Sequence, residues 1–128
     1  MMIKKQHFYN LWAFVGILMT LVVIMGSLAR TNDVPSMNLF LHLDKILHGL
    51  SYLALGFWFH QLESKKEVLI FVILICLGIA LEILQPIVSN RFFDYWDILA
   101  NSSGVFVGVL LSKKITLYEN LSKLISAS

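Results

Sequence analysis

The fold is decided by residues 43–61, LDKILHGLSYLALGFWFHQ. The body of this stretch is apolar, but its start carries an aspartate, a lysine and a histidine. Its polar residues Asp44, His48, Ser51 and Tyr52 follow the spacing of three or four that places side chains on one face of a helix. Ionisable side chains in a membrane helix face the interior of a bundle, where they find partners. We therefore expect a membrane helix with one polar face.

The composition of the whole chain supports a membrane protein. Of its 128 residues, 58% are hydrophobic and 14% are charged, whereas soluble domains have about 45–50% and about 25%. A single cysteine, Cys76, excludes an intramolecular disulfide scaffold. The net charge of +2 gives no reason to expect nucleic-acid binding. We predict an all-α polytopic membrane protein that forms one domain over residues 1–128 and has the lipid bilayer as a partner.

Four membrane spans are expected, and together they would form a four-helix bundle. They cover about residues 10–29, 43–61, 67–86 and 95–112, with Pro86 ending the third. We expect the first span to be retained rather than cleaved as a signal peptide. After Lys114, apolar residues recur at helical spacing up to Ile125. This tail is either a helix on the membrane surface or a frayed end.

The lysines and arginines predict the orientation of the spans. If both termini are cytoplasmic, seven of the ten basic residues lie inside and three outside. The inner set is Lys4, Lys5, Lys65, Lys66, Lys113, Lys114 and Lys123, and the outer set is Arg30, Lys45 and Arg91. An excess of basic residues marks the cytoplasmic side. We therefore expect both termini inside.

Three different spans place a polar residue at a similar depth. At 1.5 Å per residue, His48 and Asn101 would lie about 6 Å below the outer boundary, and Glu82 roughly 7 Å below it. Gln85 follows Glu82 by one helical turn. Asp97, Asn101, Gly104 and Gly108 form a stripe on the fourth span, and the two glycines would allow close helix packing. The sequence thus predicts a polar layer near the extracytoplasmic face.

The residue types in this layer suggest acid–base chemistry or ligand binding. The candidate catalytic residues are Asp44, His48, Glu82 and Asp97, because a carboxylate can orient an imidazole and a desolvated acid can donate a proton. The candidate ligand-binding residues are Tyr52, Gln85, Arg91 and Asn101, with Arg91 able to neutralise a carboxylate or hold an anion. Lys45 points about 100° from Asp44 and is expected to extend to the interface. His7, His42 and His60 are expected to be ordinary surface histidines.

The order and spacing of these residues resemble a known family. The pattern is Asp44-Lys45-x-x-His48-x-x-x-Tyr52, Glu82-x-x-Gln85, Arg91, and Asp97-x-x-x-Asn101-x-x-Gly104-x-x-x-Gly108. It is similar to the VanZ-like family of small bacterial membrane proteins, named for a protein associated with resistance to teicoplanin, a glycopeptide. The resemblance covers Asp44 to Gly108 and leaves the first span outside. It implies the cell envelope of a bacterium and its cytoplasmic (inner) membrane, but no reaction.

Three functions remain open at this stage. In the first, the polar layer binds a lipid-linked or other envelope-precursor ligand, or a membrane protein partner. Alternatively, it forms the acid–base cluster of an enzyme acting on such a substrate, or a hydrogen-bond network that only fixes helix register. A metal is compatible with any of these, because one histidine and three carboxylates suit Zn, Mn, Mg or Ca. No metal ligand or cofactor is assigned from sequence.

Overall fold

The protein is described by a computed structural model over residues 2–29, 37–89 and 91–127, with side chains described for 4–29, 43–89 and 91–125. These ranges are helical and contain no strand. The elements are α1 (Met2–Leu28), α2 (Met37–Leu62), the short 3₁₀ helix η1 (Ser64–Lys66), α3 (Glu67–Val88), α4 (Tyr95–Lys114) and α5 (Leu117–Ala127). The expected all-α fold is confirmed.

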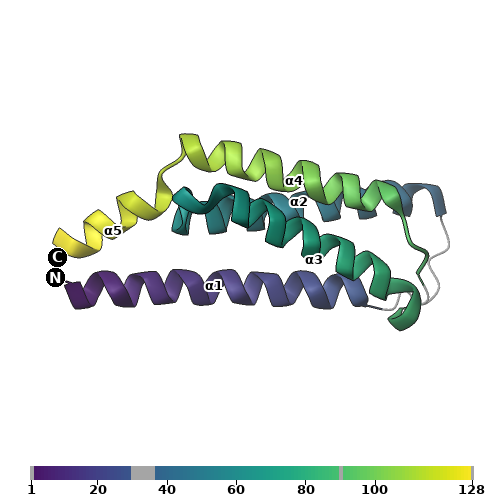
Figure 1. Cartoon of the computed structure of the whole chain (residues 1–128), viewed down its shortest axis with the longest axis horizontal. Coiled ribbons are helices and arrows are strands. Elements are labelled where there is room, and N and C mark those ends of the chain that lie inside the picture. The colour runs from purple at the N-terminus through teal and green to yellow at the C-terminus, as the bar shows by residue number, and fades with distance from the viewer. Residues whose placement is uncertain (1, 30–36, 90, 128) are drawn as a thin grey trace.

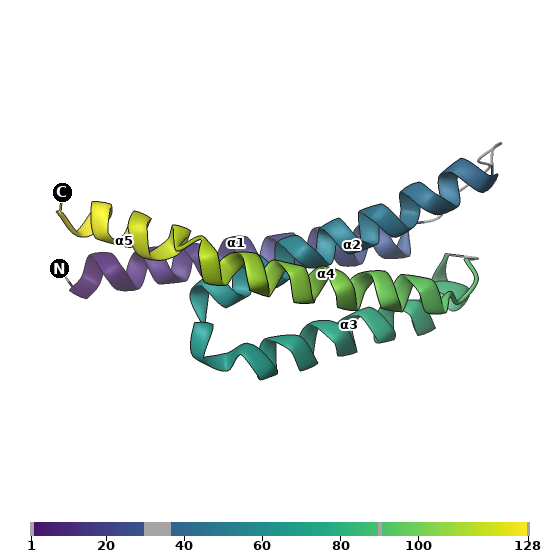
Figure 2. The same cartoon turned by 90° about the horizontal axis from the view of Figure 1, so that it is seen from above.

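The four long helices run back and forth along the long axis of the molecule (Figure 1). Both ends of the chain lie at the same end of the molecule, so α2 and α4 run parallel to each other and opposite to α1 and α3. α5 turns away from α4 by 46° and packs beside the first part of α1 (Figure 2). The segment after Lys114 is therefore a docked helix rather than a frayed end.

The helices extend beyond several of the expected spans, since α1 begins at Met2, α2 begins at Met37 and α3 passes Pro86. We expected Pro86 to end the third helix, but α3 continues to Val88. Proline lacks an N–H and fixes φ near −65°, so it disturbs the turn before it more than the residues after it. Ser89 then closes the helix, because its backbone N–H and its hydroxyl both donate to the Gln85 carbonyl.

Two helical segments are long and apolar enough to cross a membrane, Lys4–Leu28 and Ser64–Val88. A third is counted if α4 and α5 form one bent span. α2 does not qualify by composition because polar residues such as Lys45, His48 and His60 interrupt its apolar body. The described residues therefore give two or three candidate spans.

Exposure in this bundle is the reverse of that in a soluble protein. Large apolar residues cover the outside of α1, where Val22 is 68% and Met25 is 73% exposed. In contrast, Glu82 and Gln85 on α3 have no exposed surface. Polar side chains inside and apolar side chains outside are expected of helices that face lipid. This distribution agrees with the composition in indicating a membrane protein.

Glycines allow α2 and α4 to approach each other to backbone contact. A Cβ on Gly104 would overlap the carbonyl oxygen of Gly49, and a Cβ on Gly108 would overlap that of Leu53. On the opposing helix, a Cβ on Gly56 would lie 2.8 Å from the carbonyl oxygen of Val105. Small residues on parallel membrane helices permit this kind of packing. The G-x-x-x-G motif of α4 therefore lies directly against α2.

At the end that holds both termini, aromatic side chains join α1, α2 and α5. The rings of Trp12 and Trp58 stack with centroids 4.0 Å apart, and each indole N–H donates to the other residue's backbone carbonyl. Tyr118 of α5 contacts Trp12 edge-on and stacks on Phe8. This aromatic cluster (Phe8, Trp12, Trp58, Tyr118) attaches α5 to α1.

His60 was expected at the surface, and this is wrong. It is buried, and its Nδ1 lies 2.9 Å from the hydroxyl of Ser112 on α4. The close approach of α2 and α4 explains the burial, since it covers side chains on the face that α2 turns toward α4. His7 is exposed as expected, while the side chain of His42 lies outside the described residues.

The α2–α4 contact can be tested with Gly104→Ala. The added methyl group must displace the backbone of α2, and such overpacking typically costs about 1–3 kcal/mol. The free energy of unfolding, measured by SDS titration in mixed micelles with far-UV circular dichroism, should fall by this amount. The matched control is Gly26→Ala, where a Cβ meets no atom within 4 Å. Equal stability of the two variants would contradict the close contact.

Candidate functional site

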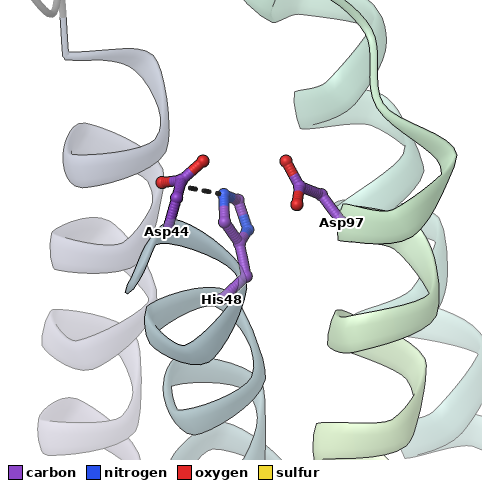
Figure 3. A group of neighbouring side chains, drawn as sticks. All are labelled: Asp44, His48 and Asp97. Atoms are coloured by element: carbon purple, nitrogen blue, oxygen red, sulfur yellow. Dashed lines mark ion pairs between the residues drawn. The ribbon is translucent and has the colours of Figure 1, made fainter. Parts of the chain in front are cut away.

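The candidate site lies at the end of the bundle where α4 begins. Asp44 and His48, one turn apart on α2, and Asp97, in the first turn of α4, point into the space between these helices (Figure 3). The Asp44 Oδ1 atom is 3.9 Å from the Nε2 atom of His48. His48 is 9% and Asp97 is 3% exposed. The structure thus brings together three of the four candidate catalytic residues.

Asn101 fixes the orientation of the His48 ring. The Asn101 Oδ1 atom lies 3.2 Å from the His48 Nδ1 atom, and both side chains are buried. Because an amide oxygen only accepts, Nδ1 carries the proton in a neutral ring and donates it. The Nε2 atom of the ring faces Asp44.

Lys45 is part of the site, contrary to the expectation that it extends to the interface. Its Nζ atom lies 2.9 Å from Asp97 Oδ1 and 2.5 Å from Asp94 Oδ2. Two carboxylates at the start of α4 attract the ammonium across the α2–α4 interface. This hydrogen bond from Lys45 holds the pKa of Asp94 below its usual range.

Arg91, in the connection between α3 and α4, forms an ion pair with Asp44 through its Nη2 atom. Both side chains are mostly buried, with 16% and 18% exposed. The expected neutralisation of one carboxylate by Arg91 is therefore present in the structure. A guanidinium has five N–H donors, more than this ion pair uses.

Glu82 lies beside these site residues. Among the described residues it forms no hydrogen bond or ion pair with His48. It is completely buried, and its Oε2 accepts from the backbone N–H of Asp94 at 3.3 Å. Its Oε1 has no hydrogen-bond partner among the described residues. Asp97, His48 and Arg91 act on it electrostatically. Glu82 is therefore a neighbour of the site, one layer further from the pocket.

Gln85 and Tyr52 are also fully buried, on the side of the site that faces α1 and α3. Gln85 donates to the hydroxyl of Ser27 at 2.9 Å and to the Ser27 carbonyl at 3.2 Å, which links α3 to α1. The Tyr52 hydroxyl has no partner among the described residues. A Cβ on Gly78 would lie 3.3 Å from this hydroxyl and 3.1 Å from Asn101 Nδ2. Gly78 therefore makes room for both side chains.

A pocket of about 260 Å³ opens beside the site, between α1 and α2. We call it the α1/α2 pocket. Its polar lining is Ser27, Asp44, His48, Ser51 and Arg91, and its apolar lining is Val22, Val23, Gly26 and Leu47. Charged groups thus lie next to an apolar wall. This arrangement suits a ligand that has both a polar and an apolar part.

Sequence reasoning missed three residues of the site. Lys45 was assigned to the interface because a helical wheel considers one helix alone, whereas its partners lie on another element. Asp94 is the N-cap of α4, and its side chain accepts from the Trp96 N–H at 2.8 Å. An aspartate directly before an apolar helix is a recognisable cap signal. No comparable signal marks Ser27, because a serine near the end of a helix is common.

The fold and its buried charges define a small all-helical membrane protein. The chain belongs to the VanZ/LLP1 family, whose model matches residues 2–118. The resemblance seen in the sequence is confirmed, but the match is longer than the Asp44–Gly108 pattern and includes α1. No curated protein and no solved structure matches the chain.

The Lys45–Asp94 pair predicts a pH dependence that Asp94→Asn should reduce. A carboxyl whose pKa is lowered by folding adds stability above its unfolded pKa of about 3.9 and loses it as the pH falls through the folded value. The free energy of unfolding of the natural protein should therefore fall below about pH 4, and less steeply in the variant. Asparagine caps a helix about as well as aspartate, so the variant keeps the cap.

The control for this measurement is Glu119→Gln. It neutralises an exposed carboxylate that has no ion pair among the described residues. This control should show the same acid-induced loss as the natural protein. Parallel pH profiles for Asp94→Asn and the natural protein would show that the pair adds no stability.

Proposed function

We propose that this protein binds a lipid-linked or other anionic envelope-precursor ligand in the α1/α2 pocket, within the cytoplasmic membrane of a bacterium. The observation that carries the proposal is the pocket itself, in which Arg91, Asp44 and His48 lie next to Val22, Val23 and Gly26. A phosphate or carboxylate headgroup would pair with Arg91, which binds such groups with two parallel hydrogen bonds. The apolar chain would lie along α1.

The charge arrangement supports an anionic headgroup. Arg91 already pairs with Asp44, so an entering anion must share or replace that partner. The guanidinium has donors to spare for a second acceptor. Asn101 and Tyr52 do not line the pocket. Asn101 orients His48, and Tyr52 is buried in the core. Gln85 holds the α1 wall through Ser27.

We further propose that α1, α2, α3 and α4 all cross the membrane as one domain, with both termini cytoplasmic and α5 at the membrane surface. The alternating directions of the four helices support this arrangement (Figure 1). The polar groups that weaken α2 as a span are buried against α4 instead of facing lipid. The pocket then lies near the extracytoplasmic face.

Cysteine labelling tests this topology. In a Cys76→Ala background, Phe92→Cys should react with a membrane-impermeant maleimide in intact cells, because Phe92 is 92% exposed in the proposed outer connection. Lys65→Cys, in the proposed inner connection, should react only after permeabilisation. Labelling of position 65 but not of position 92 in intact cells would reverse the orientation, and labelling of both positions would contradict the single crossing by α3 between them.

Binding itself is tested with a polyprenyl phosphate and the purified protein in native mass spectrometry. Arg91→Gln should bind this lipid at least about tenfold more weakly, because a hydrogen bond to a charged group contributes about 1.5–3 kcal/mol. The matched control is Lys123→Gln, which removes one exposed positive charge from α5. This control should bind like the natural protein.

A second variant distinguishes a loss of binding from a loss of folding. Arg91→Gln leaves Asp44 unpaired, whereas Asp44→Asn combined with Arg91→Gln removes both charges of the pair. The double variant should fold and still fail to bind. Unchanged affinity in both variants would contradict the proposed headgroup site.

An enzyme is the second candidate function, and one contact favours it. Asn101 orients the His48 ring so that Nε2 is free to accept a proton, as a general base requires. Glu82 and Asp97 would complete the acid–base group. Within the described residues no serine hydroxyl or thiol is hydrogen-bonded to His48, so the reaction proposed for this alternative is activation of a water molecule. We place binding first because the pocket supports it directly.

A further inference from the structure

Three potential ligand atoms from α2 and α4 converge at the site. One atom each from Asp44, His48 and Asp97 lies within 4.8 Å of the other two. The three side chains point into the same gap between the helices (Figure 3). His48 and Asp97 are buried, and Asp44 is half-buried. One nitrogen and two carboxylates in one place form a set that divalent metals use.

The space between His48 and Asp44 can hold a cation. With the Nδ1 of His48 turned to Asn101, its Nε2 faces the carboxylate oxygen Asp44 Oδ1 across 3.9 Å. Nε2 has no hydrogen bond within the described part of the chain, and His48 lines the α1/α2 pocket. A positive charge between these two atoms, either a proton on the imidazole or a metal cation, removes their repulsion.

Permanent positive charges are fewer than carboxylates around this gap. The three carboxylates are Asp44, Asp94 and Asp97, and the two permanent cations are Lys45 and Arg91, while His48 adds a positive charge only when it is protonated. Each ion pair with Asp44 and Asp97 uses one carboxylate oxygen, Asp44 Oδ2 and Asp97 Oδ1. The second oxygen of each carboxylate remains for another cation. Uncompensated charge is costly at this depth in a membrane.

We propose that Asp44, His48 and Asp97 form a binding site for a divalent transition-metal cation of the Zn²⁺ type. The ligand atoms, which lie within 4.8 Å of one another, must close in to reach bonding distances of about 2.0–2.2 Å, so the proposal requires the two aspartate side chains to rotate toward His48. Asp44 and His48 also line the α1/α2 pocket. The cation would therefore offer an open coordination position to the pocket, where a phosphate oxygen or a water could bind.

Asn101 is the positioning residue of this site. A histidine that binds a metal donates its other ring N–H to an acceptor that fixes the ring, and loss of the acceptor costs about 10–100-fold in metal affinity. The contact of Asn101 Oδ1 with Nδ1 fits this role. The inference goes beyond headgroup binding, since a metal site would exist whether or not the pocket holds a lipid.

The test is titration of the chelator-stripped full-length protein in detergent with Zn²⁺ alone, by calorimetry. We expect one Zn²⁺ per chain, with Mg²⁺ unable to displace it because Mg²⁺ prefers oxygen ligands. His48→Ala should abolish binding, and Asn101→Ala should weaken it about 10–100-fold. The matched control is His7→Ala, which removes an exposed histidine on α1 and should leave binding unchanged.

Several results would overturn the proposal: no binding to the natural protein, stoichiometric binding that survives His48→Ala, or loss of binding in His7→Ala. Asp97→Asn is an isosteric second variant, and it should also abolish binding while far-UV circular dichroism shows the natural helix content. Arg91→Gln should keep Zn²⁺ binding. A loss of lipid binding can therefore be distinguished from a loss of Zn²⁺ binding.

Discussion

The close contact between α2 and α4 is the constraint on which the rest of the structure depends. Gly49 and Gly56 on one helix, and Gly104 and Gly108 on the other, let two parallel backbones touch. Because the helices run in the same direction, this contact sets their register along its whole length. At one end it brings His48 to Asn101, and at the other it brings His60 to Ser112. The glycine contacts between the two ends of this interface therefore set the positions of both polar pairs.

This register also explains how a weakly apolar helix is accommodated. α2 carries ionisable groups near both ends, and two of those that the structure describes have partners on α4: Lys45 with Asp97, and His60 with Ser112. Polar contacts between membrane helices contribute only about 0.6–2 kcal/mol each, so they are an expensive way to hold a bundle. Tight glycine packing can supply adhesion without charges. The small contribution of polar contacts is the reason we propose a binding role for the charged groups at the start of α4 in addition to any effect on stability.

The sequence was sufficient for the all-helical class, the approximate positions of the helices and the family, because apolar runs and 3–4 spacing are local signals. It placed His48, Asn101 and Asp97 on faces that the structure joins. It failed for Lys45 and His60, whose surroundings depend on the distance between two helices, and for Ser27, whose partner Gln85 lies on another helix. Pro86 was expected to end the third helix, but α3 continues beyond it. Contacts between helices are the information that one sequence does not contain.

The two walls of the α1/α2 pocket come from different parts of the chain, and this has a consequence for specificity. α1 contributes Val22, Val23 and Gly26, whereas the charged residues come from α2 and the connection before α4. For the proposed lipid ligand, most of the wall along the acyl chain and the charged groups around the headgroup would therefore be altered by substitutions in different segments of the chain.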